Sequence, residues 1–537
     1  MSLLVIDRLS LEIHGAPILK GVSLSVSAGQ VVGVIGESGS GKSMTAFAAM
    51  QLLPYGSVCS GRIDLGGREV LALSEANLCK MRGRDVGMVF QEPMTALNPI
   101  KTIGEQVAET ILIHEGVTRA EALERAAEAL RRAELPQDRF PLSRYPHELS
   151  GGQRQRVVIA MAIALRPKLL IADEPTTALD VTTQAQILKL LRRLVDEEGM
   201  GLLLISHDLA VVADMADEIV IMRKGEVVES GPAEWLLRNM QHPYSKALLA
   251  ASTHQPDREA EEQDDVLLDV REVVRDYTIH RKGWWGGTET FRAVKGVSFQ
   301  LRKGESLGLV GESGCGKSTL TRAILGLEEI QDGEIRAFGA PVGRDFPNAL
   351  RSGIQVVFQD PYSSFNPRWK VSRLVAEPFH LMSQRPDDWR DRVAQVLQDV
   401  GLEPDAMDRY IHEFSGGQRQ RIAIARALIL RPEIVILDEA VSALDVSIRA
   451  QILDLLAKLQ GEYGLSYLFI SHDLSVVRSI TDRVMVMKSG EIVEQGETAA
   501  VFDAPQHEYT KQLIAAAPVL PGDVTGGERH DRPEPVV

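Results

Sequence analysis

The chain has 537 residues, of which 44% are hydrophobic and 25% charged, and it carries a formal net charge of −15. This length and composition are typical of a multi-domain globular protein and exclude a wholly disordered or fibrous chain. The acidic charge argues against a nucleic-acid partner, because binding to phosphate backbones is driven by Lys and Arg. The three cysteines form no CxxC motif, which excludes a disulfide framework or a four-cysteine metal centre.

The first chemical motif follows an apolar run at residues 31–35 that reads as a buried strand. GESGSGKS at 36–43 fits the GxxxxGK[ST] phosphate-loop pattern, and a helical run at 44–53 comes directly after it. Glycines let the backbone turn its N–H groups toward phosphate oxygens, Lys42 offers a positive charge to the β- and γ-phosphates, and Ser43 offers a hydroxyl to Mg²⁺. This junction is therefore predicted to bind a nucleotide.

Helices are predicted between VFQEP (89–93) and HELSGGQRQR (147–156), where we expect an inserted helical subdomain. A capping-box pattern at 118–121 opens one of them, which ends near Pro136. Its predicted apolar face consists of Leu123, Ala127 and Leu130. LSGGQ at 149–153 puts a serine and two glycines before an apolar helix, which fits an anion-binding helix N-terminus and equally a well-capped structural helix.

Two further predicted strands, at 169–172 and 202–205, each end in residues that can act on a phosphate. Asp173 and Glu174 follow the first strand and His207 follows the second. The carboxyl ends of parallel strands meet at the sheet edge where doubly wound proteins bind ligands. We therefore expect Asp173 to hold Mg²⁺ through its shell, Glu174 to polarise the attacking water, and His207 to contact the γ-phosphate.

The second half of the chain repeats these motifs in the same order, at offsets between 265 and 275 residues. The repeats are LGLVGESGCGKS (307–318), VFQDP (357–361), HEFSGGQRQR (412–421) and ISHDL (470–474). Strands are predicted at 307–310, 434–437 and 468–470, and a helix ending at Gly401 has an apolar stripe of Trp389, Val393, Val396, Leu397 and Val400. A period this long indicates two whole domains rather than a solenoid. Strand–helix alternation predicts an α/β fold with a mostly parallel sheet in each half.

Domain boundaries are indicated by composition. Residues 253–265 (THQPDREAEEQDD) are polar and acidic, which is typical of a linker. The first domain is thus expected to span 1–252 and the second 266–520. Residues 521–537 are rich in Gly, Pro and charge and are predicted to be a disordered tail.

Taken in order, these duplicated motifs resemble the ATP-binding-cassette (ABC) ATPases. GESGSGKS, FQEPMTALNP, RYPHELSGGQRQR and the HPYSKALL ending resemble more narrowly the oligopeptide/dipeptide/nickel importer branch. Two such ATPases in one chain are similar to the fused ATPases of microcin C and peptide importers, with the glutathione-importer ATPases as close relatives. The resemblance implies tandem P-loop ATPase domains, each with a mostly parallel sheet core, an antiparallel β part and an inserted helical subdomain.

The resemblance also implies that the cassettes pair head to tail, so that each phosphate loop faces the signature motif of the other half across ATP. The catalytic residues that it implies are Glu174, Glu439, His207 and His472. For Mg²⁺ it implies Ser43, Gln91, Asp173, Ser318, Gln359 and Asp438. For the nucleotide in the phosphate loops it implies Gly36, Glu37, Ser38, Gly39, Ser40, Gly41, Lys42, Ser43, Met44, Gly311, Glu312, Ser313, Gly314, Cys315, Gly316, Lys317, Ser318 and Thr319. For the signature motifs and the seam it implies Ser150, Gly151, Gly152, Gln153, Ser415, Gly416, Gly417, Gln418, Asp180 and Asp445.

The adenine-stacking aromatic of the family corresponds to Tyr277 in the second half and to Ile13 in the first, so stacking is expected only in the second. Cys315 stands where the first loop has Ser40. A nearby lysine and a helix N-terminus lower thiol pKa values, so we expect a reactive Cys315 whose alkylation blocks the second site. Trp284 and Trp285 lie in a Gly-rich insertion and are expected to touch membrane partners or lipid, or to pack on their own sheet.

By this resemblance the chain hydrolyses ATP to energise import of peptides or peptide-like solutes. Its partners would be two integral-membrane permease subunits and an extracytoplasmic solute-binding protein, and Gln91 and Gln359 would relay closure to the permeases. No stretch of the sequence reads as a membrane span, so the chain is expected to sit peripherally at the cytoplasmic face of a bacterial inner membrane. The alternative is a soluble twin-cassette ATPase acting on ribosomes, for which a long charged helical linker and basic surfaces are expected.

Overall fold

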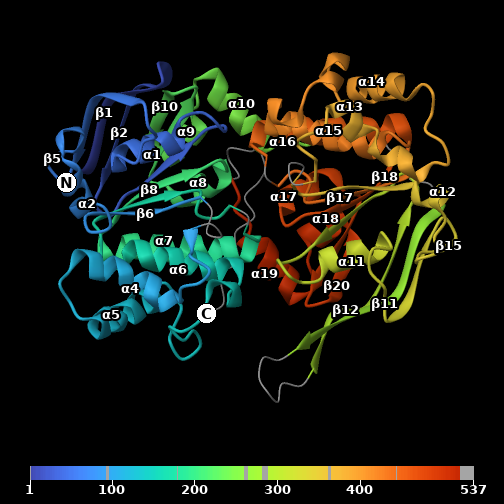
Figure 1. Ribbon diagram of the computed structural model, residues 1–537, viewed down its shortest axis with the longest axis horizontal. Coiled ribbons are helices and arrows are strands. Elements are labelled where there is room, and N and C mark those ends of the chain that lie inside the picture. Colours follow the sequence, from blue (N-terminus) through green and yellow to red (C-terminus); the bar gives the residue numbers. More distant parts are fainter. Residues whose placement is uncertain are drawn as a thin grey trace.

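The computed structural model describes residues 2–91, 96–177, 179–258, 264–280, 288–360, 364–442 and 444–520. Trp284 and Trp285, part of the predicted linker and the predicted tail lie outside the described residues. Two similar halves lie side by side, each built of an antiparallel sheet, a mainly parallel sheet and surrounding helices (Figure 1).

The core of the first half is a six-stranded sheet in the order β10-β9-β3-β8-β7-β6. Its strands are β3 (Val31–Ile35), β6 (Val86–Val89), β7 (Leu169–Asp173), β8 (Gly201–Ser206), β9 (Glu218–Arg223) and β10 (Glu226–Pro232). All pairs are parallel except β9 with β10. Every residue of β3, β6, β7 and β8 is buried, as expected for strands covered on both faces. The strands predicted at 31–35, 169–172 and 202–205 are confirmed.

The antiparallel sheet of the first half has the order β2-β1-β4-β5. Its strands are β1 (Ser2–Ile13), β2 (Ala16–Ser27), β4 (Ser57–Leu65) and β5 (Arg68–Glu69). Alternate residues of β1, including Leu4 and Ile6, are buried, as is typical of a sheet with one covered face. They share one hydrophobic cluster with Val34 of β3 and Ala46, so that this sheet and the parallel sheet enclose the helix that follows the phosphate loop.

The helices of the first half are α1 (Lys42–Met50), α2 (Glu75–Met81), α4 (Ile103–His114), α5 (Arg119–Arg132), α6 (Gly151–Ile163), α7 (Val181–Glu198), α8 (Leu209–Met215), α9 (Ala233–Arg238) and α10 (Pro243–Ser252). Short 3₁₀ turns lie at Val70–Ala72 and Pro146–Glu148. Helices α4, α5 and α6, which include the expected inserted helices, share one hydrophobic cluster with α7 and with strands β7 and β8 of the parallel sheet. Thr118 caps α5, and Leu130 of the predicted face is buried, but the rest of the buried face is Ala122, Ala126 and Ala129, while the predicted Leu123 and Ala127 are only partly buried. Small alanine side chains let α5 approach its neighbours closely, and Leu123 is left partly buried at the edge.

The second half repeats the strand order, with sheets β16-β17-β18-β13-β19-β20 and β12-β11-β14-β15. The strands are β11 (Val266–His280), β12 (Thr288–Arg302), β13 (Ser306–Val310), β14 (Asp332–Ala337), β15 (Ala340–Pro341), β16 (Ile354–Val357), β17 (Ile434–Asp438), β18 (Ser466–Ile470), β19 (Arg483–Lys488) and β20 (Glu491–Glu497). The helices are α11 (Lys317–Ile324), α12 (Asn348–Arg351), α13 (Val371–Val375), α14 (Trp389–Asp399), α15 (Gly416–Leu428), α16 (Val446–Tyr463), α17 (Leu474–Ile480), α18 (Thr498–Asp503) and α19 (Glu508–Ala516). Short 3₁₀ turns lie at Glu377–Leu381, Pro404–Asp408 and Ile411–Glu413.

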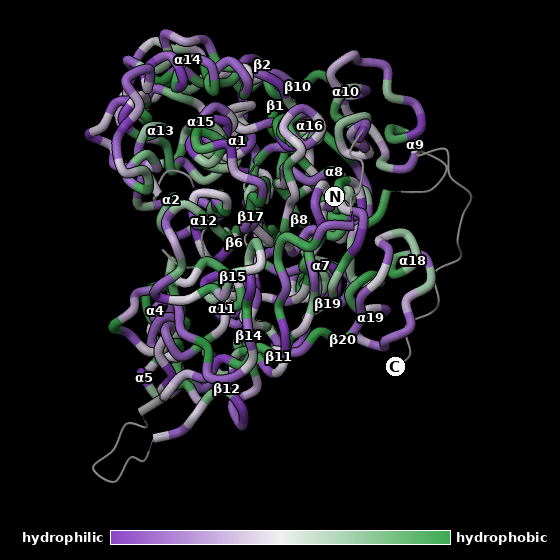
Figure 2. The backbone as a smooth tube through the Cα atoms, turned by 90° about the vertical axis from the view of Figure 1, so that its right-hand side faces the viewer, coloured by the Kyte–Doolittle hydropathy of each residue, from purple (hydrophilic) through white to green (hydrophobic). Residues whose placement is uncertain are grey.

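The predicted stripe of α14 is confirmed, because Val393, Val396 and Leu397 are buried and the helix stops before Gly401. The strands predicted at 307–310, 434–437 and 468–470 are confirmed as β13, β17 and β18. Figure 2 shows hydrophobic residues gathered in interior strands such as β8 and β17. Among the described helices, none has the length and apolar character needed to cross a membrane.

Helices form the contact between the halves: α10 lies against α16, and α19 lies against α7 (Figure 1). Val446 of α16 belongs to a hydrophobic cluster with Leu209 and Tyr244 of the first half. The chain after α10 also docks on the second half, where His254 Nε2 lies 2.5 Å from Asp454 Oδ1 and Arg258 donates to Asp482 (2.8 Å). The two halves are therefore in direct contact.

Candidate nucleotide sites

The first phosphate loop links β3 to α1 and wraps around the Lys42 ammonium group. Lys42 Nζ donates to the carbonyl oxygens of Gly36 (2.6 Å) and Glu37 (3.0 Å). Gly39 and Gly41 have φ values of 76° and 100°, in the left-handed region that favours glycine. Burial lowers the pKa of Lys42, against the opposing effect of nearby carboxylates. The loop thus holds a buried cation beside a helix N-terminus, an arrangement suited to phosphate.

Oxygen ligands for a divalent cation lie next to this loop. Ser43 Oγ, at the start of α1, donates to Asp173 Oδ1 at the end of β7 (3.0 Å). Burial raises the pKa of Asp173 to about 6, while the bond from Ser43 opposes the shift. A hydroxyl and a carboxylate oxygen in contact are hard donors of the kind that Mg²⁺ prefers. The residues present therefore fit the predicted metal.

Glu174 is the centre of a hydrogen-bonded group at the same sheet edge. Its Oε2 accepts from Gln91 Nε2 (2.9 Å) and Thr177 Oγ1 (2.9 Å), and it lies 3.2 Å from His207 Nδ1. Burial alone would raise the pKa of Glu174, but the hydrogen bond and charge of His207, helped by Thr177 and Lys42, lower it to about 2. The carboxylate is thus ionised, and the structure brings together Gln91, Glu174 and His207 as predicted.

The second half builds the same arrangement with fewer direct contacts. Lys317 Nζ donates to the carbonyl oxygens of Gly311 (2.6 Å) and Glu312 (2.9 Å), and His472 Nδ1 lies 3.3 Å from Glu439 Oε1. Burial raises the pKa of Asp438; it would also raise that of Glu439, but the bond and charge of His472 lower it.

Two side-chain hydrogen bonds of the first site, Ser43–Asp173 and Gln91–Glu174, are not repeated in the second half. Within the part of the chain that the structure describes, no hydrogen bond joins Ser318 to Asp438 or Gln359 to Glu439. The second set of side chains is therefore less tightly connected than the first.

The expected lowering of the Cys315 thiol pKa is wrong. Its side chain is buried, with 7% of the residue exposed, and burial raises the thiol pKa although Lys317 Nζ lies 3.9 Å from the sulfur. The desolvation of the thiolate outweighs the attraction of the lysine. A buried thiol with a raised pKa is poorly reactive.

Tyr277 has an Arg on one face of its ring. The Arg275 guanidinium carbon lies 4.7 Å from the ring centroid, and the tyrosine hydroxyl donates to Glu328 and lies 3.4 Å from Thr319 Oγ1. Tyr277 is therefore tied to α11, the helix of the second phosphate loop. The residue at the same position in the first half, Ile13, packs partly buried in the hydrophobic core.

Both signature motifs form capped helix N-termini. Ser150 Oγ accepts from the backbone N–H of Gln153 (3.4 Å) and Gln153 Oε1 accepts from that of Ser150 (3.0 Å). Ser415 and Gln418 form the same reciprocal pair at α15 (3.4 and 3.1 Å). Both pairs are exposed, so the caps leave the helix ends open to a ligand or partner.

A residue of the second half contacts the first phosphate loop. Asp445 Oδ1 accepts a hydrogen bond from the backbone N–H of Ser38 (2.9 Å). Asp180, its equivalent in the first half, accepts instead from Thr183 N–H (2.9 Å) and caps its own helix α7. The two predicted seam residues are thus used differently.

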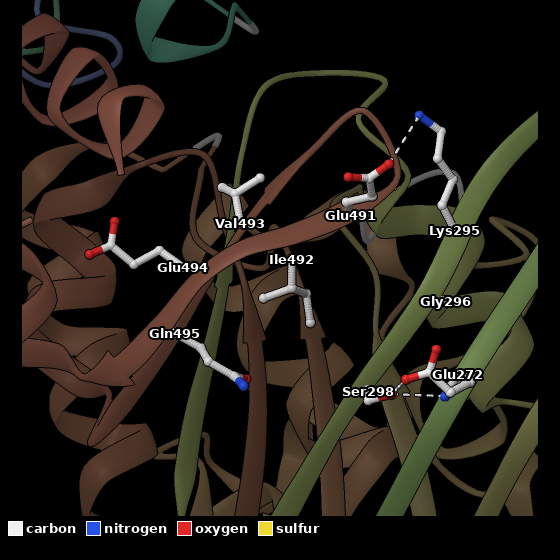
Figure 3. Close-up of a pocket in the computed structure, with 9 residues that line it drawn as sticks. All are labelled: Glu272, Lys295, Gly296, Ser298, Glu491, Ile492, Val493, Glu494 and Gln495. Carbon is white, nitrogen blue, oxygen red and sulfur yellow. Dashed lines mark hydrogen bonds and ion pairs between the residues drawn. The ribbon is translucent and has the colours of Figure 1, made fainter. Parts of the chain in front are cut away.

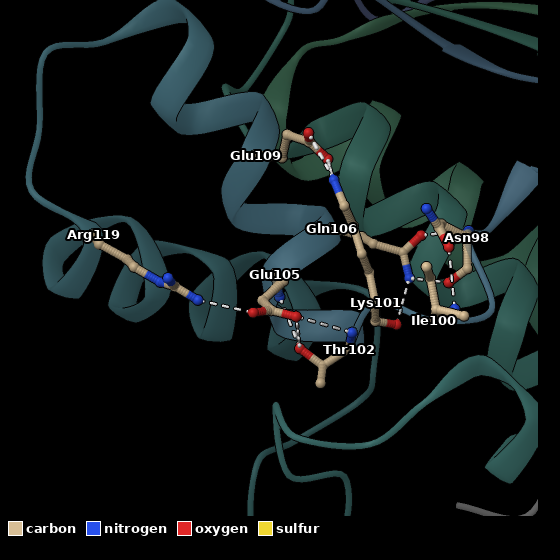
Figure 4. Close-up of polar contacts among 8 residues, drawn as sticks. All are labelled: Asn98, Ile100, Lys101, Thr102, Glu105, Gln106, Glu109 and Arg119. Atoms are coloured by element: carbon tan, nitrogen blue, oxygen red, sulfur yellow. Dashed lines mark hydrogen bonds and ion pairs between the residues drawn. The ribbon is translucent and has the colours of Figure 1, made fainter.

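The residues from Asn98 to the start of α4 form a fixed turn that leads into the helical subdomain (Figure 4). Gln106 of α4 bonds both the N–H and the carbonyl of Asn98 (2.8 and 3.1 Å), and Thr102 and Glu105 form a capping box at the start of α4. Lys101 also pairs with Glu109 (2.9 Å). These contacts fix the turn from Asn98 into α4.

An open groove of about 500 Å³ lies elsewhere, between β12 and β20 of the second half (Figure 3). Glu272, Glu491 and Glu494 line it with Lys295. None of the predicted nucleotide-site residues is part of this lining, so the groove is separate from the phosphate loops.

Sequence reasoning gave no role to Tyr244 and Tyr509, which contact the phosphate loops directly. Each hydroxyl accepts a backbone N–H of the loop in its own half, at 3.0 Å from Glu37 and 3.2 Å from Glu312. The sequence feature that could have revealed them is the repeated segment that ends each half, HPYSKALLAA and HEYTKQLIAA, because the tyrosine occupies the same position in both copies.

Comparison with known proteins identifies the class. The family model of ABC transporters matches residues 19–177 and 294–442, and that of the oligopeptide/dipeptide transporter C-terminal region matches 228–272 and 493–534. The chain therefore belongs to the ABC transporter family, as an ATPase coupled to transport with two cassettes of its oligopeptide/dipeptide branch.

Curated relatives agree with this assignment. The glutathione import ATP-binding protein of Escherichia coli K12 is 48% identical over 538 residues, covering 93% of this chain and 86% of its own. The protein of the same name from Salmonella typhi is 47% identical, with the same coverage. Among solved structures, an ATPase from Clostridium perfringens that is part of an ABC transporter complex is 32% identical, covers 45% of this chain and 92% of its own, and has a TM-score of 0.40. The curated relatives are named as import ATP-binding proteins, and the ribosome-acting alternative has no support among them.

Proposed function

We propose that this chain energises an importer for peptides or peptide-like solutes, with glutathione-sized peptides as the first candidates, through two composite ATP sites. The observation that carries the proposal is the duplicated set of lysine, paired carboxylates and histidine, with a residue of one half bonded to the phosphate loop of the other. The C-terminal family match and the relatives named for glutathione import support the solute class.

In each proposed site the ionised glutamate has the chemical role of orienting and polarising the attacking water. The hydrogen bond and charge of His207 outweigh burial and keep the pKa of Glu174 low, so that the carboxylate is ionised. The contact with His207 also fixes the direction of the carboxylate (3.2 Å). His207 would then contact the γ-phosphate, and Lys42 would turn from the loop carbonyls to the phosphates. Glu439, His472 and Lys317 take these roles in the second half.

The proposed Mg²⁺ ligands are Ser43, Asp173 and Gln91 in the first site and Ser318, Asp438 and Gln359 in the second. When bound, Mg²⁺ neutralises charge on the β- and γ-phosphates as the bond between them breaks. The contact between Ser43 and Asp173 supports this assignment (3.0 Å).

The exposed signature N-termini would complete the sites: Ser415–Gln418 at the first phosphate loop and Ser150–Gln153 at the second. ATP held by both halves would stabilise the closed pair, and hydrolysis would remove that bridge. The difference in free energy between closed and open pairs is then available for transport. Tyr277 remains the proposed adenine contact of the second site.

The proposed partners are two integral-membrane permease subunits and an extracytoplasmic solute-binding protein, which would hold the chain at the cytoplasmic face of the inner membrane. Gln91 bonds the proposed catalytic carboxylate of Glu174, and a fixed turn at Asn98 a few residues later leads into α4, so the helical subdomain is the proposed route of coupling (Figure 4). The proposed domains remain 1–252 and 266–520, with the linker at 253–265.

Reconstitution tests the solute class. The full chain would be placed in liposomes with candidate permease subunits and a candidate binding protein, and uptake of labelled glutathione, a tripeptide and a pentapeptide would be measured with ATP enclosed on the ATPase side. ATP-dependent uptake of at least one peptide is expected. Uptake of sugars or metal ions alone would overturn the peptide assignment.

A further inference from the structure

Tyr244 and Tyr509 connect each phosphate loop to the C-terminal helix of its own half. The Tyr244 hydroxyl of α10 accepts the backbone N–H of Glu37 (3.0 Å), and the Tyr509 hydroxyl of α19 accepts that of Glu312 (3.2 Å). Glu37 and Glu312 follow the first glycine of each loop, so the hydroxyls act on the turn that leads from the sheet into the phosphate-binding backbone.

The side chain of Tyr244 is held in a fixed position. It is 6% exposed, and the Arg223 guanidinium carbon lies 4.8 Å from its ring centroid. His242 caps α10 by accepting the backbone N–H of Tyr244 (3.2 Å), and Glu229 accepts the N–H of His242 (3.3 Å). The hydroxyl is thus presented to the loop by an ordered helix start.

The second half repeats each of these contacts. Tyr509 is 4% exposed, with Lys488 Nζ 4.6 Å from its ring centroid. His507 accepts the backbone N–H of Tyr509 (3.1 Å), and Glu494 accepts that of His507 (3.0 Å). Two copies of one geometry, built with different residues at several neighbouring positions, indicate a function for the hydroxyl rather than a local accident.

The same helices also face the opposite half. Helix α10 lies against α16, and α19 lies against α7 (Figure 1). In the first loop, the N–H of Glu37 is held by Tyr244 of its own half and the next N–H, that of Ser38, by Asp445 of the other half (2.9 Å). Two consecutive backbone groups of the loop are therefore set by elements that meet at the seam.

We propose that Tyr244 and Tyr509 are positioning residues that hold the phosphate loops in the conformation that binds ATP, so that the C-terminal helix of each half sets the ATP affinity of its own site. Removing the hydroxyl leaves a loop N–H without its partner and frees the turn, which weakens binding by about fivefold, the typical effect of one hydrogen bond. The inference rests on the proposed nucleotide sites.

Site-resolved photolabelling tests it. The full chain and its Tyr244→Phe and Tyr509→Phe variants would be titrated with azido-ATP and Mg²⁺, irradiated and digested, and mass spectrometry would assign the label to either half. Tyr244→Phe is expected to raise the half-saturating concentration about fivefold in the first half only, and Tyr509→Phe in the second half only. In steady-state hydrolysis, KM for ATP should rise in both variants with kcat nearly unchanged.

Tyr467→Phe is the matched control, because this buried hydroxyl donates to the carbonyl of Leu456 (2.9 Å) and touches no phosphate loop. It is expected to lower Tm without changing either half-saturating concentration. Unchanged labelling in Tyr244→Phe and Tyr509→Phe, or an equal shift in Tyr467→Phe, would overturn the inference. Failure of the unaltered chain to label at all would instead overturn the proposed nucleotide sites, and the two failures are distinguishable.

Discussion

Asp445 of the second half accepts the backbone N–H of Ser38 in the first half across 2.9 Å, although 407 residues separate them in sequence. The contact exists only when the two halves are paired. Its counterpart Asp180 is used within the first half, where it caps α7. One phosphate loop is therefore joined to the other half by this bond, while the equivalent aspartate stabilises a helix.

Replacing these two aspartates separates the two roles. Asp445→Ala is expected to weaken ATP binding at the first site by about fivefold, because a charged acceptor of a loop N–H is lost. Asp180→Ala is expected to lower the free energy of unfolding by about 1 kcal/mol, the usual cost of a lost helix cap. Site-resolved nucleotide binding and thermal unfolding measure the two effects. Equal losses of affinity in both variants would contradict the assignment.

The two glycines of the first signature motif differ in the space around them. A Cβ on Gly152 would lie 2.2 Å from Thr183 Cγ2, whereas a Cβ on Gly151 would meet only Leu179 Cδ2 at 3.7 Å. Gly152→Ala is therefore expected to destabilise the chain by about 1–3 kcal/mol through overpacking of α6 on α7. Gly151→Ala should leave Tm nearly unchanged, and calorimetry of both variants checks this. A stable Gly152→Ala variant would mean that α6 and α7 separate at little cost.

Much of the fold could be predicted from the sequence because its signals are local. Fully buried parallel strands need uninterrupted apolar runs, and β3, β7 and β17 have them directly before the phosphate loop or the paired carboxylates. The carboxyl ends of parallel strands lie at one sheet edge. The positions of Lys42, Asp173 and His207 directly after predicted strands were therefore enough to predict that these residues lie close together.

The errors and omissions concern properties that depend on packing. The pKa of Cys315 is set first by burial, which a loop motif does not reveal. The buried face of α5 consists mainly of alanines, which hydrophobic periodicity ranks below the leucines. The contact of Tyr244 with Glu37 joins segments 207 residues apart, and only the repetition of the tyrosine in both halves hinted at it.

Asp473 gives a prediction for pH. Its carboxylate accepts from Arg449 Nη1 (2.6 Å) and from the N–H of Ser475 (3.0 Å). Burial would raise the pKa of Asp473, but the charge of Arg449, the hydrogen bond from the Ser475 hydroxyl and the charge of His472 lower it. A lowered carboxyl pKa stabilises the fold above the ordinary value of about 3.9, and the contribution is lost as pH falls through the folded-state pKa.

Asp473→Asn is therefore expected to lower the free energy of unfolding by about 2 kcal/mol at pH 7, and this loss of stability should become smaller below about pH 4. The control is Asp208→Asn, because the first half has Gln184 at the position of Arg449 and Asp208 caps α8 through Ala210 N–H (2.9 Å). Asp208→Asn is expected to lower the free energy of unfolding by about 1 kcal/mol. Thermal unfolding between about pH 2 and 8 measures both variants, and a loss for Asp473→Asn that stays constant over this whole range would refute the ion-pair account.

The cysteines should differ in reactivity. Cys79 is exposed, while Cys315 is buried with a raised pKa caused by that burial. At pH 7.5, iodoacetamide is expected to modify Cys79 at least about tenfold faster than Cys315, because only the thiolate reacts and access is needed. Peptide mass spectrometry over time measures the two rates. Faster labelling of Cys315 would restore the original expectation of an activated thiol in the loop.

The central claim is that both halves hydrolyse ATP to energise import. Its most direct test is the ATPase rate of the full chain in liposomes with its permeases, with and without loaded binding protein, for the unaltered chain, Glu174→Gln, Glu439→Gln and the double variant. We predict stimulation by the loaded binding protein and a loss of at least about a hundredfold in the double variant, as expected when the carboxylates proposed to polarise the attacking water are removed. Hydrolysis that persists in the double variant, or that responds only to ribosomes, would contradict the account.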